Sequence, residues 1–163
     1  MQTKYPLEKL KQSAIKIESQ LRISLKNINK KLLLKLFKEY HNDCFNKINC
    51  LDCANCCREL GPRITGQDID KISKHLHITP GNFIEKYLLI DEDNDFVFKS
   101  MPCPFLNTDN YCKIYEVRPV ACREYPHTDS NKIIKNIDIL MKNNKICPAS
   151  LEVSIKLMKH SNA

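Results

Sequence analysis

The sequence is poor in glycine and has no long apolar run. It contains only three glycines, Gly61, Gly66 and Gly81, so it has no glycine-rich loop of the kind that binds nucleotide phosphates. No apolar stretch reaches the roughly 18 residues that a bilayer-spanning helix needs. The first residues, MQTKYPLEKLKQS, lack the apolar segment of a secretory signal. We therefore expect a cytoplasmic protein with no membrane partner, folded as one globular unit.

Acidic residues are scarce at both ends of the chain, so the net charge of +7 is unevenly distributed. Residues 1–49 carry eleven Lys and Arg against four Asp and Glu, and residues 131–163 carry six against two. Residues 50–130 carry nine against thirteen. No nucleic-acid-binding motif or row of stacking aromatics accompanies the lysines. We interpret them as solvated helix faces, with binding of RNA or an acidic protein partner as the alternative.

Cysteine, by contrast, is abundant. Four of the nine cysteines fall in the run CLDCANCC at residues 50–57, and four more follow at Cys103, Cys112, Cys122 and Cys147. In a reducing compartment, nine thiols argue against a disulfide framework, and so does their odd number. Thiols spaced two residues apart can converge on one ion, because a tight turn brings both sulfurs to the same side. The sequence therefore predicts a metal site.

The thiols alone do not decide which metal is bound. With Cys44 set aside as an outlier, the remaining eight thiols are enough for two Cys₄ zinc sites. Cys56 and Cys57 point about 100° apart on a helix, so we expect them to serve two sites, or one wide cluster, rather than one ion. Cys50, Cys53 and Cys56 also form the C-x₂-C-x₂-C part of a ferredoxin run, but Leu60 stands where the fourth cysteine belongs. Zinc and iron, including an iron–sulfur cluster, both stay open, as does the pairing of the thiols.

Arginine is scarce and is concentrated near the cysteines. Arg58 directly follows Cys57, Arg123 directly follows Cys122, and Arg118 lies four residues before Cys122. A guanidinium can hydrogen-bond to thiolates and offset their charge. The alternative is ordinary ion pairing with the neighbouring glutamates.

Cys44 and His127 lie outside the main cysteine pattern. We interpret Cys44 as a small buried residue on a helix. His127 is a candidate metal ligand, a hydrogen-bond partner of a ligand, or a structural histidine. No nucleophile signature surrounds any cysteine, so the sequence identifies no catalytic residue, and whether the protein is an enzyme stays open.

The spacing of apolar residues predicts a mainly α fold. Leu and Ile recur at helical spacing through residues 6–45, with a bend or break near Asn27 and Asn29. A pair of helices that covers the core is favoured over a dimerising coiled coil. Further helices are expected from Thr65 to about His77, from Pro80 to about Leu89, over 131–143 and from about 151.

Two short segments are expected between these helices. Residues 96–99 read as a strand that pairs with residues 111–115 in a small β-hairpin. The turn before it, residues 91–95, is not a calcium loop because Phe96 stands where that loop has glycine. A short helical segment after Pro119 carries Cys122 in its first turn, where backbone amides favour a thiolate.

The cysteine run, followed in order by TGQDIDKISKHL, PCPFL, YCKIYEVRPVACREYPH and NNKICPA, resembles the CxxCxxCC cysteine-cluster family. These YkgJ-like bacterial proteins are described as zinc- or iron-chelating domains. The resemblance covers about residues 48–150. It implies a chelating domain at 48–150, and the basic helical arm at 1–47 and the C-terminal helix at 151–163 fall outside it. We expect these amphipathic N- and C-terminal helices to flank a small, metal-stabilised, cysteine-rich core.

The resemblance also implies a ligand set and a function. The implied metal ligands are Cys50, Cys53, Cys56, Cys57, Cys103, Cys112, Cys122 and Cys147. We expect a zinc- or iron-binding protein whose thiolate-bound metal is required for the fold. The alternative is an iron–sulfur redox enzyme or a cofactor-dependent protein-modifying enzyme. A related motif occurs in longer flagellin lysine methylases that use S-adenosylmethionine, but the lack of a glycine-rich loop argues against methyl transfer by this chain.

Overall fold

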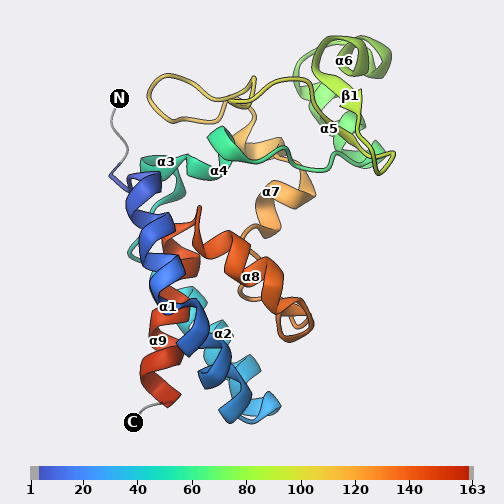
Figure 1. Cartoon of the computed structure of the whole chain (residues 1–163). Helices are drawn as coiled ribbons and strands as arrows, with labels where there is room; N and C mark the ends of the chain where they lie inside the picture. Colours follow the sequence, from blue (N-terminus) through green and yellow to red (C-terminus); the bar gives the residue numbers. More distant parts are fainter. Residues whose placement is uncertain (1–3, 162–163) are drawn as a thin grey trace. The chain divides into compact units, whose positions relative to one another are not determined.

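A computed structural model describes residues 4–161, which fall into two compact units (Figure 1). The hairpin unit is the continuous segment Cys56–Tyr125. The helical unit combines residues 4–55 with residues 126–161. The two units are described separately below. The limits expected at 47/48 and 150/151 differ from these unit boundaries and stay predictions.

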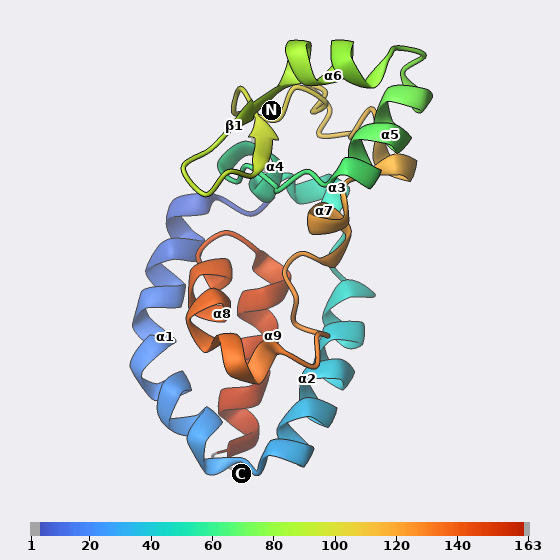
Figure 2. The same ribbon diagram turned by 90° about the vertical axis from the view of Figure 1, so that its right-hand side faces the viewer.

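The helical unit is built around its C-terminal helix. Helix α9 (Pro148–Ser161) packs against α1 (Leu7–Asn27), α2 (Lys30–Phe45) and α8 (Ile137–Asn144), and Figure 2 shows it flanked by α1 and α2. The unit also contains α3 (Cys50–Cys53), a single helical turn, and the first residue of α4 (Asn55–Glu59). Burial of the apolar faces supplies the main driving force, and the largest fully buried apolar side chains of the unit are Leu21, Phe37, Ile133, Leu140, Val153 and Leu157.

The predicted break in the N-terminal helix is confirmed. Helix α1 ends at Asn27, and Asn29 begins α2 by accepting a hydrogen bond from the Leu32 backbone N–H at 3.0 Å through its side-chain oxygen. The helix expected over 131–143 is a 3₁₀ turn at Ile133–Asn136 that continues as α8. The final helix begins three residues earlier than expected, at Pro148, since proline suits the first helical position.

The hairpin unit places four helices, a small sheet and a 3₁₀ turn around a separate apolar core. Its elements are most of α4 (Asn55–Glu59), α5 (Gly66–His75), α6 (Pro80–Tyr87), β1 (Leu88–Ile90), β2 (Phe96–Phe98), a 3₁₀ turn (Tyr115–Val117) and α7 (Val120–Glu124). The core is formed by Ile64, Ile69, Ile72, Phe83, Leu88, Phe98, Phe105 and Ile114. Cys103 and Cys112 are partly buried against it.

The helix starts predicted at Thr65 and Thr79 are confirmed. Thr65 and Asp68 form a reciprocal capping box at the start of α5. The Thr79 hydroxyl accepts a hydrogen bond from the Asn82 backbone N–H at 3.2 Å at the start of α6. Helix α6 ends at Tyr87 rather than near Leu89, because Leu88 enters β1.

The expected partner of the strand near residue 96 is wrong. Strand β2 pairs antiparallel with β1, with Leu88 opposite Phe98, and not with residues 111–115. The Asp91 side chain accepts hydrogen bonds from the backbone N–H groups of Asp93 and Asp95 at 3.0 and 2.9 Å. The turn that Asp91 stabilises reverses the chain directly after β1, so β2 pairs with β1, the strand nearest to it in sequence. The fold is nonetheless mainly α with one short hairpin, as predicted.

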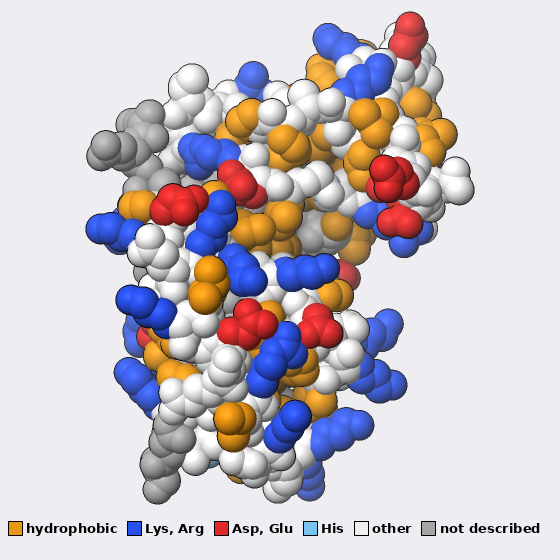
Figure 3. Space-filling model, viewed as in Figure 1, with side chains coloured by type: hydrophobic (Ala, Val, Ile, Leu, Met, Phe, Trp, Pro, Cys, Tyr) orange, Lys and Arg blue, Asp and Glu red, His pale blue; other side chains and the backbone are white. Residues whose placement is uncertain are grey.

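Basic side chains are spread over the helical unit. It carries 17 Lys and Arg against eight Asp and Glu, whereas the hairpin unit carries nine against eleven. Figure 3 shows Lys and Arg side chains scattered over the visible face of α1, α2 and α8, with acidic and apolar side chains between them. None of the helices between residues 4 and 161 is long and apolar enough to cross a membrane.

Candidate metal centre

Four thiols from four separate segments lie close together in the hairpin unit. Burial raises the pKa of Cys122 to about 12, and the charges of Cys57, Cys103 and Cys112 raise that pKa further. Burial raises the pKa of Cys103 to about 11, with further contributions from Cys57 and Cys112. Burial also raises the pKa of Cys112, and Cys57 adds to that increase. Every pair among the four thiols therefore interacts electrostatically, although only chain folding brings them together.

Backbone hydrogen bonds fix two of these sulfurs. The Cys103 N–H donates to the Cys57 carbonyl oxygen at 2.8 Å. The backbone N–H groups of Phe105 and Leu106 donate to the Cys103 sulfur and oppose the rise in its pKa. The N–H of Ile114 does the same for the Cys112 sulfur. Such N–H···S bonds favour the thiolate form, which is the form that binds metal.

Two of the three arginines singled out by the sequence act on these thiols. The pKa of Cys57 is lowered to about 7, first by a hydrogen bond with Cys56 and then, against burial, by the charges of Arg58 and Arg118. The charge of Arg118 also partly opposes the rise in the pKa values of Cys112 and Cys122. The prediction that arginines offset thiolate charge therefore agrees with the positions of Arg58 and Arg118. The guanidinium of the third, Arg123, donates to the Arg118 carbonyl oxygen instead.

The structure bears on two expectations about individual cysteines. The sulfurs of Cys56 and Cys57 lie 4.0 Å apart, and the expectation that they serve two sites or one wide cluster stays a prediction. Cys122 lies in the short helix α7 as expected, but the thiolate-stabilising effect of a helix start does not dominate there. Burial among three other thiols outweighs it, as the raised pKa of Cys122 shows.

A second group of thiols lies in the helical unit. Cys50 and Cys53 stand at the two ends of α3, and Cys147 directly precedes α9. Burial raises the pKa of Cys147 to about 12, and the charges of Cys50 and Cys53 also raise it. The N–H groups of Ser150 and Ala149, in the first turn of α9, donate to the Cys147 sulfur and oppose the rise. Two of the predicted ligands, Cys50 and Cys53, therefore act electrostatically on a third, Cys147, within this unit.

A buried polar network holds the start of α9 beside Cys147. The Asn144 side-chain amide is 1% exposed and is hydrogen-bonded to the Ser150 hydroxyl at 2.7 Å and to the Ser154 hydroxyl. The Cys147 N–H donates to the Asn143 carbonyl oxygen at 2.8 Å. Sequence reasoning missed Asn144, because an Asn near a helix end is usually exposed and nothing local marks this one as buried.

Sequence reasoning also missed Tyr115. Its ring lies under the Arg118 guanidinium, three residues further on, and this i,i+3 spacing was the available signal. Arg118 therefore has a platform that holds its charge near the thiols. His127 adopts a left-handed backbone conformation, with φ of 64°, and its expected role as ligand or donor stays a prediction.

The donor chemistry of both groups fits a thiophilic metal. No disulfide joins any of the nine cysteines, all of which lie within residues 4–161, and sulfur donors suit zinc and iron–sulfur clusters alike. The side-chain positions are less convergent than a finished coordination shell. Within residues 4–161, no three His, Cys, Asp or Glu side chains are arranged so that they could hold a metal ion.

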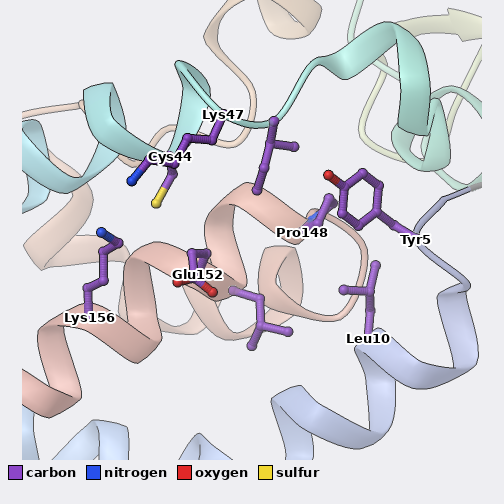
Figure 4. Close-up of a pocket in the computed structure, with 9 residues that line it drawn as sticks. Tyr5, Leu10, Cys44, Lys47, Pro148, Glu152 and Lys156 are labelled. Atoms are coloured by element: carbon purple, nitrogen blue, oxygen red, sulfur yellow. The ribbon is translucent and has the colours of Figure 1, made fainter.

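Cys44 lies apart from both groups, beside a pocket of about 370 Å³ in the helical unit (Figure 4). It is 1% exposed, and burial raises its pKa to about 11, in agreement with its interpretation as a small buried residue. Lys47 and Lys156 line the pocket and both form ion pairs with Asp43. Together with Glu152 these side chains are neutral overall, so the pocket does not select a ligand by charge.

Comparison with known proteins finds one family whose model matches more than half of the chain. The model of a family described as "CxxCxxCC: Putative zinc- or iron-chelating domain" matches residues 49–148. An uncharacterised protein of Methanocaldococcus jannaschii is 31% identical over 83 residues, which are 49% of this chain and 44% of that protein. The chain thus spans less than half the length of this relative. No solved structure matches the chain.

Proposed function

The chain belongs to the CxxCxxCC family, and on that premise we propose that it is a metal-binding protein whose thiolates hold zinc or iron and whose fold depends on that metal. One observation carries the proposal: the four thiols of Cys57, Cys103, Cys112 and Cys122 all interact electrostatically with one another in the hairpin unit. Four thiols are the complete ligand complement of a structural zinc site. The YkgJ-like subgroup stays a prediction.

The proposed ligand set comprises eight cysteines in two groups. The hairpin unit supplies the four thiols just named, and the helical unit supplies Cys50, Cys53 and Cys147. Cys56 is the eighth member. It continues the two-residue spacing of Cys50 and Cys53 and also contacts the Cys57 sulfur. Loss of metal on replacing Cys56 with serine tests whether Cys56 is a ligand.

The surrounding residues prepare the hairpin unit for a charged centre. A divalent ion with four thiolates carries a net charge of about −2 by the count of its ligands. Arg58 and Arg118 offset that charge. The backbone N–H groups that donate hydrogen bonds to the Cys103 and Cys112 sulfurs stabilise the thiolates. When bound, the ion cross-links the segments that carry its ligands, which stabilises a glycine-poor chain with a modest core.

We infer a cytoplasmic location, because nine cysteines that form no disulfide persist best in a reducing compartment. The metal ion is the partner that the thiols define. No catalytic residue is assigned, and iron–sulfur chemistry enters as an outcome of the metal analysis below.

Elemental analysis after anaerobic purification tests the proposal. We expect about one metal ion for each of the two groups of cysteines. The protein should be colourless with zinc, or coloured and containing labile sulfide with an iron–sulfur cluster. A strong chelator should remove the metal together with the helical circular-dichroism signal, because binding is coupled to folding. Full helical signal in a chain that binds no metal contradicts the proposal.

Serine variants provide the matched control. Cys103→Ser removes one proposed ligand and should lower the metal content of the chain. Cys44→Ser changes a cysteine that is at least as buried but lies outside both groups, and the metal content should stay unchanged.

A further inference from the structure

The carboxylate of Asp68 is almost completely buried yet hydrogen-bonded on both oxygens. Asp68 lies in the first turn of α5 and is 1% exposed. One oxygen accepts hydrogen bonds from the Thr65 N–H at 3.0 Å and the Thr65 hydroxyl at 2.6 Å. The other oxygen accepts from the Val120 N–H at 3.1 Å. A buried carboxylate is costly unless it is hydrogen-bonded, and half of this compensation comes from a residue far away in the sequence.

The distant residue, Val120, is the first residue of α7. Helix α7 is only five residues long, and its N-cap, Pro119, makes no side-chain capping bond. The first N–H groups of a helix have no partner within the helix. Asp68 therefore supplies to α7, from another helix, the acceptor that a capping side chain normally provides. Its negative charge also suits a helix start.

Cys122 lies in the turn that this contact anchors. The N–H groups of Cys122 and Arg123 both donate to the Pro119 carbonyl oxygen, at 3.0 and 3.1 Å. The backbone from Pro119 to Arg123 is thus one hydrogen-bonded turn. Asp68 joins it to α5, which the buried side chains Ile69 and Ile72 fix in the apolar core.

From these contacts we propose that Asp68 is a positioning residue for Cys122, holding the start of α7 so that this thiol meets Cys57, Cys103 and Cys112. The inference rests on the proposed metal-binding function. It assigns to Asp68 a second role beyond helix capping, since a cap needs one carboxylate oxygen and Asp68 commits the other to the cysteine-bearing turn.

Two substitutions break this contact from opposite sides. Asp68→Asn replaces one carboxylate oxygen with an N–H₂ group. Either the two Thr65 donors or the Val120 N–H then loses its acceptor. Val120→Pro removes the donor N–H and leaves the Thr65–Asp68 capping box intact. Proline suits the first helical position, and the preceding Pro119 is already extended, with φ −49° and ψ 149°, as a residue before proline prefers.

The controls match each change. Val120→Ala truncates the same side chain but keeps the N–H. Thr79→Ala removes a cap of the same type at the start of α6, where no contact with α7 is involved. Cys122→Ser removes the proposed ligand itself.

Titration of the intact chain with Co²⁺, followed by thiolate-to-cobalt absorption, provides the readout. Asp68→Asn and Val120→Pro should each weaken binding at one site by about 10- to 100-fold, as substitutions behind metal ligands do. The absorption per ion at that site should fall by one thiolate's share. Val120→Ala and Thr79→Ala should change neither quantity. In a Cys122→Ser chain, Asp68→Asn should cause no further loss, because it acts through Cys122.

Several results overturn the inference. Unchanged affinity and absorption in folded Asp68→Asn do so, and so does an equal loss of affinity with or without Cys122. If Asp68→Asn does not fold, unchanged binding by Val120→Pro overturns it instead. Failure of the proposed function is distinguished by the unsubstituted chain, which then binds no Co²⁺ or binds it equally well after Cys57→Ser.

Discussion

The guanidinium of Arg118 lies over the ring of Tyr115, 3.6 Å from its centroid, and its Nε donates to the Tyr115 carbonyl oxygen at 2.9 Å. The stacking and the hydrogen bond together hold a positive charge beside Cys57, Cys112 and Cys122. A planar guanidinium can make both contacts at once, whereas an ammonium cannot.

Replacing Arg118 with glutamine should therefore raise the pKa of Cys57 above its value of about 7, because a favourable charge is lost. Because only thiolates bind the metal, Co²⁺ titration of the chain over a pH series should show this change as a shift of binding to higher pH. Arg118→Lys should give an intermediate shift. Arg63→Gln is the matched control, since Arg63 forms an ion pair with Asp95 at 2.8 Å. Identical pH profiles of Co²⁺ binding for Arg118→Gln and Arg63→Gln contradict the assignment.

Metal binding by the hairpin unit should release protons. Burial keeps Cys103, Cys112 and Cys122 protonated at neutral pH, with raised pKa values, whereas Cys57, with a pKa of about 7, is about half ionised. Because the ligands must be thiolates, binding one ion at pH 7 should release between about three and four protons. Affinity should accordingly rise with pH across the neutral range. Calorimetric titration with Zn²⁺ in buffers of different ionisation enthalpy counts these protons, and release of fewer than about two per ion argues against a four-thiol site.

Acid should weaken the helical unit through His41. Burial lowers its pKa below the ordinary 6.5, although Asp129, 3.9 Å away, partly opposes the shift. The unfolded chain therefore takes up this proton first, so stability is full above about pH 6.5 and falls as the pH drops through the lowered pKa of the folded state. Urea unfolding between pH 5 and 7.5 measures the effect. The slope should decrease in His41→Gln and increase in Asp129→Asn, and an unchanged slope in both variants excludes His41 as its source.

The buried amide of Asn144 should be worth far more than an exposed one. Asn144→Ala leaves the Ser150 and Ser154 hydroxyls short of a partner, which should cost about 1–3 kcal/mol of unfolding free energy. Asn42, an exposed residue on α2, provides the control: Asn42→Ala should change stability by less than about 0.5 kcal/mol. Denaturant titration compares the two variants, and equal costs refute a structural role for the network.

The helices were predictable from the sequence because their signals are local. The apolar spacing, the Asn27–Asn29 break and the caps at Thr65 and Thr79 each depend on residues within one or two helical turns, and the structure confirms them. The strand pairing failed for the opposite reason. Nothing in residues 96–99 distinguishes a partner at 88–90 from one at 111–115, and the choice depends on the turn at Asp91.

The grouping of the thiols was likewise beyond local reasoning. Spacing shows which cysteines can reach one ion but not which ones the fold brings together. The structure assigns Cys50 and Cys53 to the helical unit, beside Cys147, and Cys57 to the hairpin unit, beside Cys122. The Asp68–Val120 contact carries no sequence signal either, because a capping aspartate looks the same whether or not its second oxygen is used.

The order of the two units along the chain has a consequence for modularity. The hairpin unit is one continuous stretch, whereas the helical unit is interrupted after Asn55 and resumes at Pro126. The chain order is that of one unit placed within another, an arrangement that domain insertion can produce. The continuous segment contains Cys57, Cys103, Cys112 and Cys122 together with Arg58, Arg118 and Asp68, so every residue proposed for its metal centre lies on one uninterrupted stretch of chain.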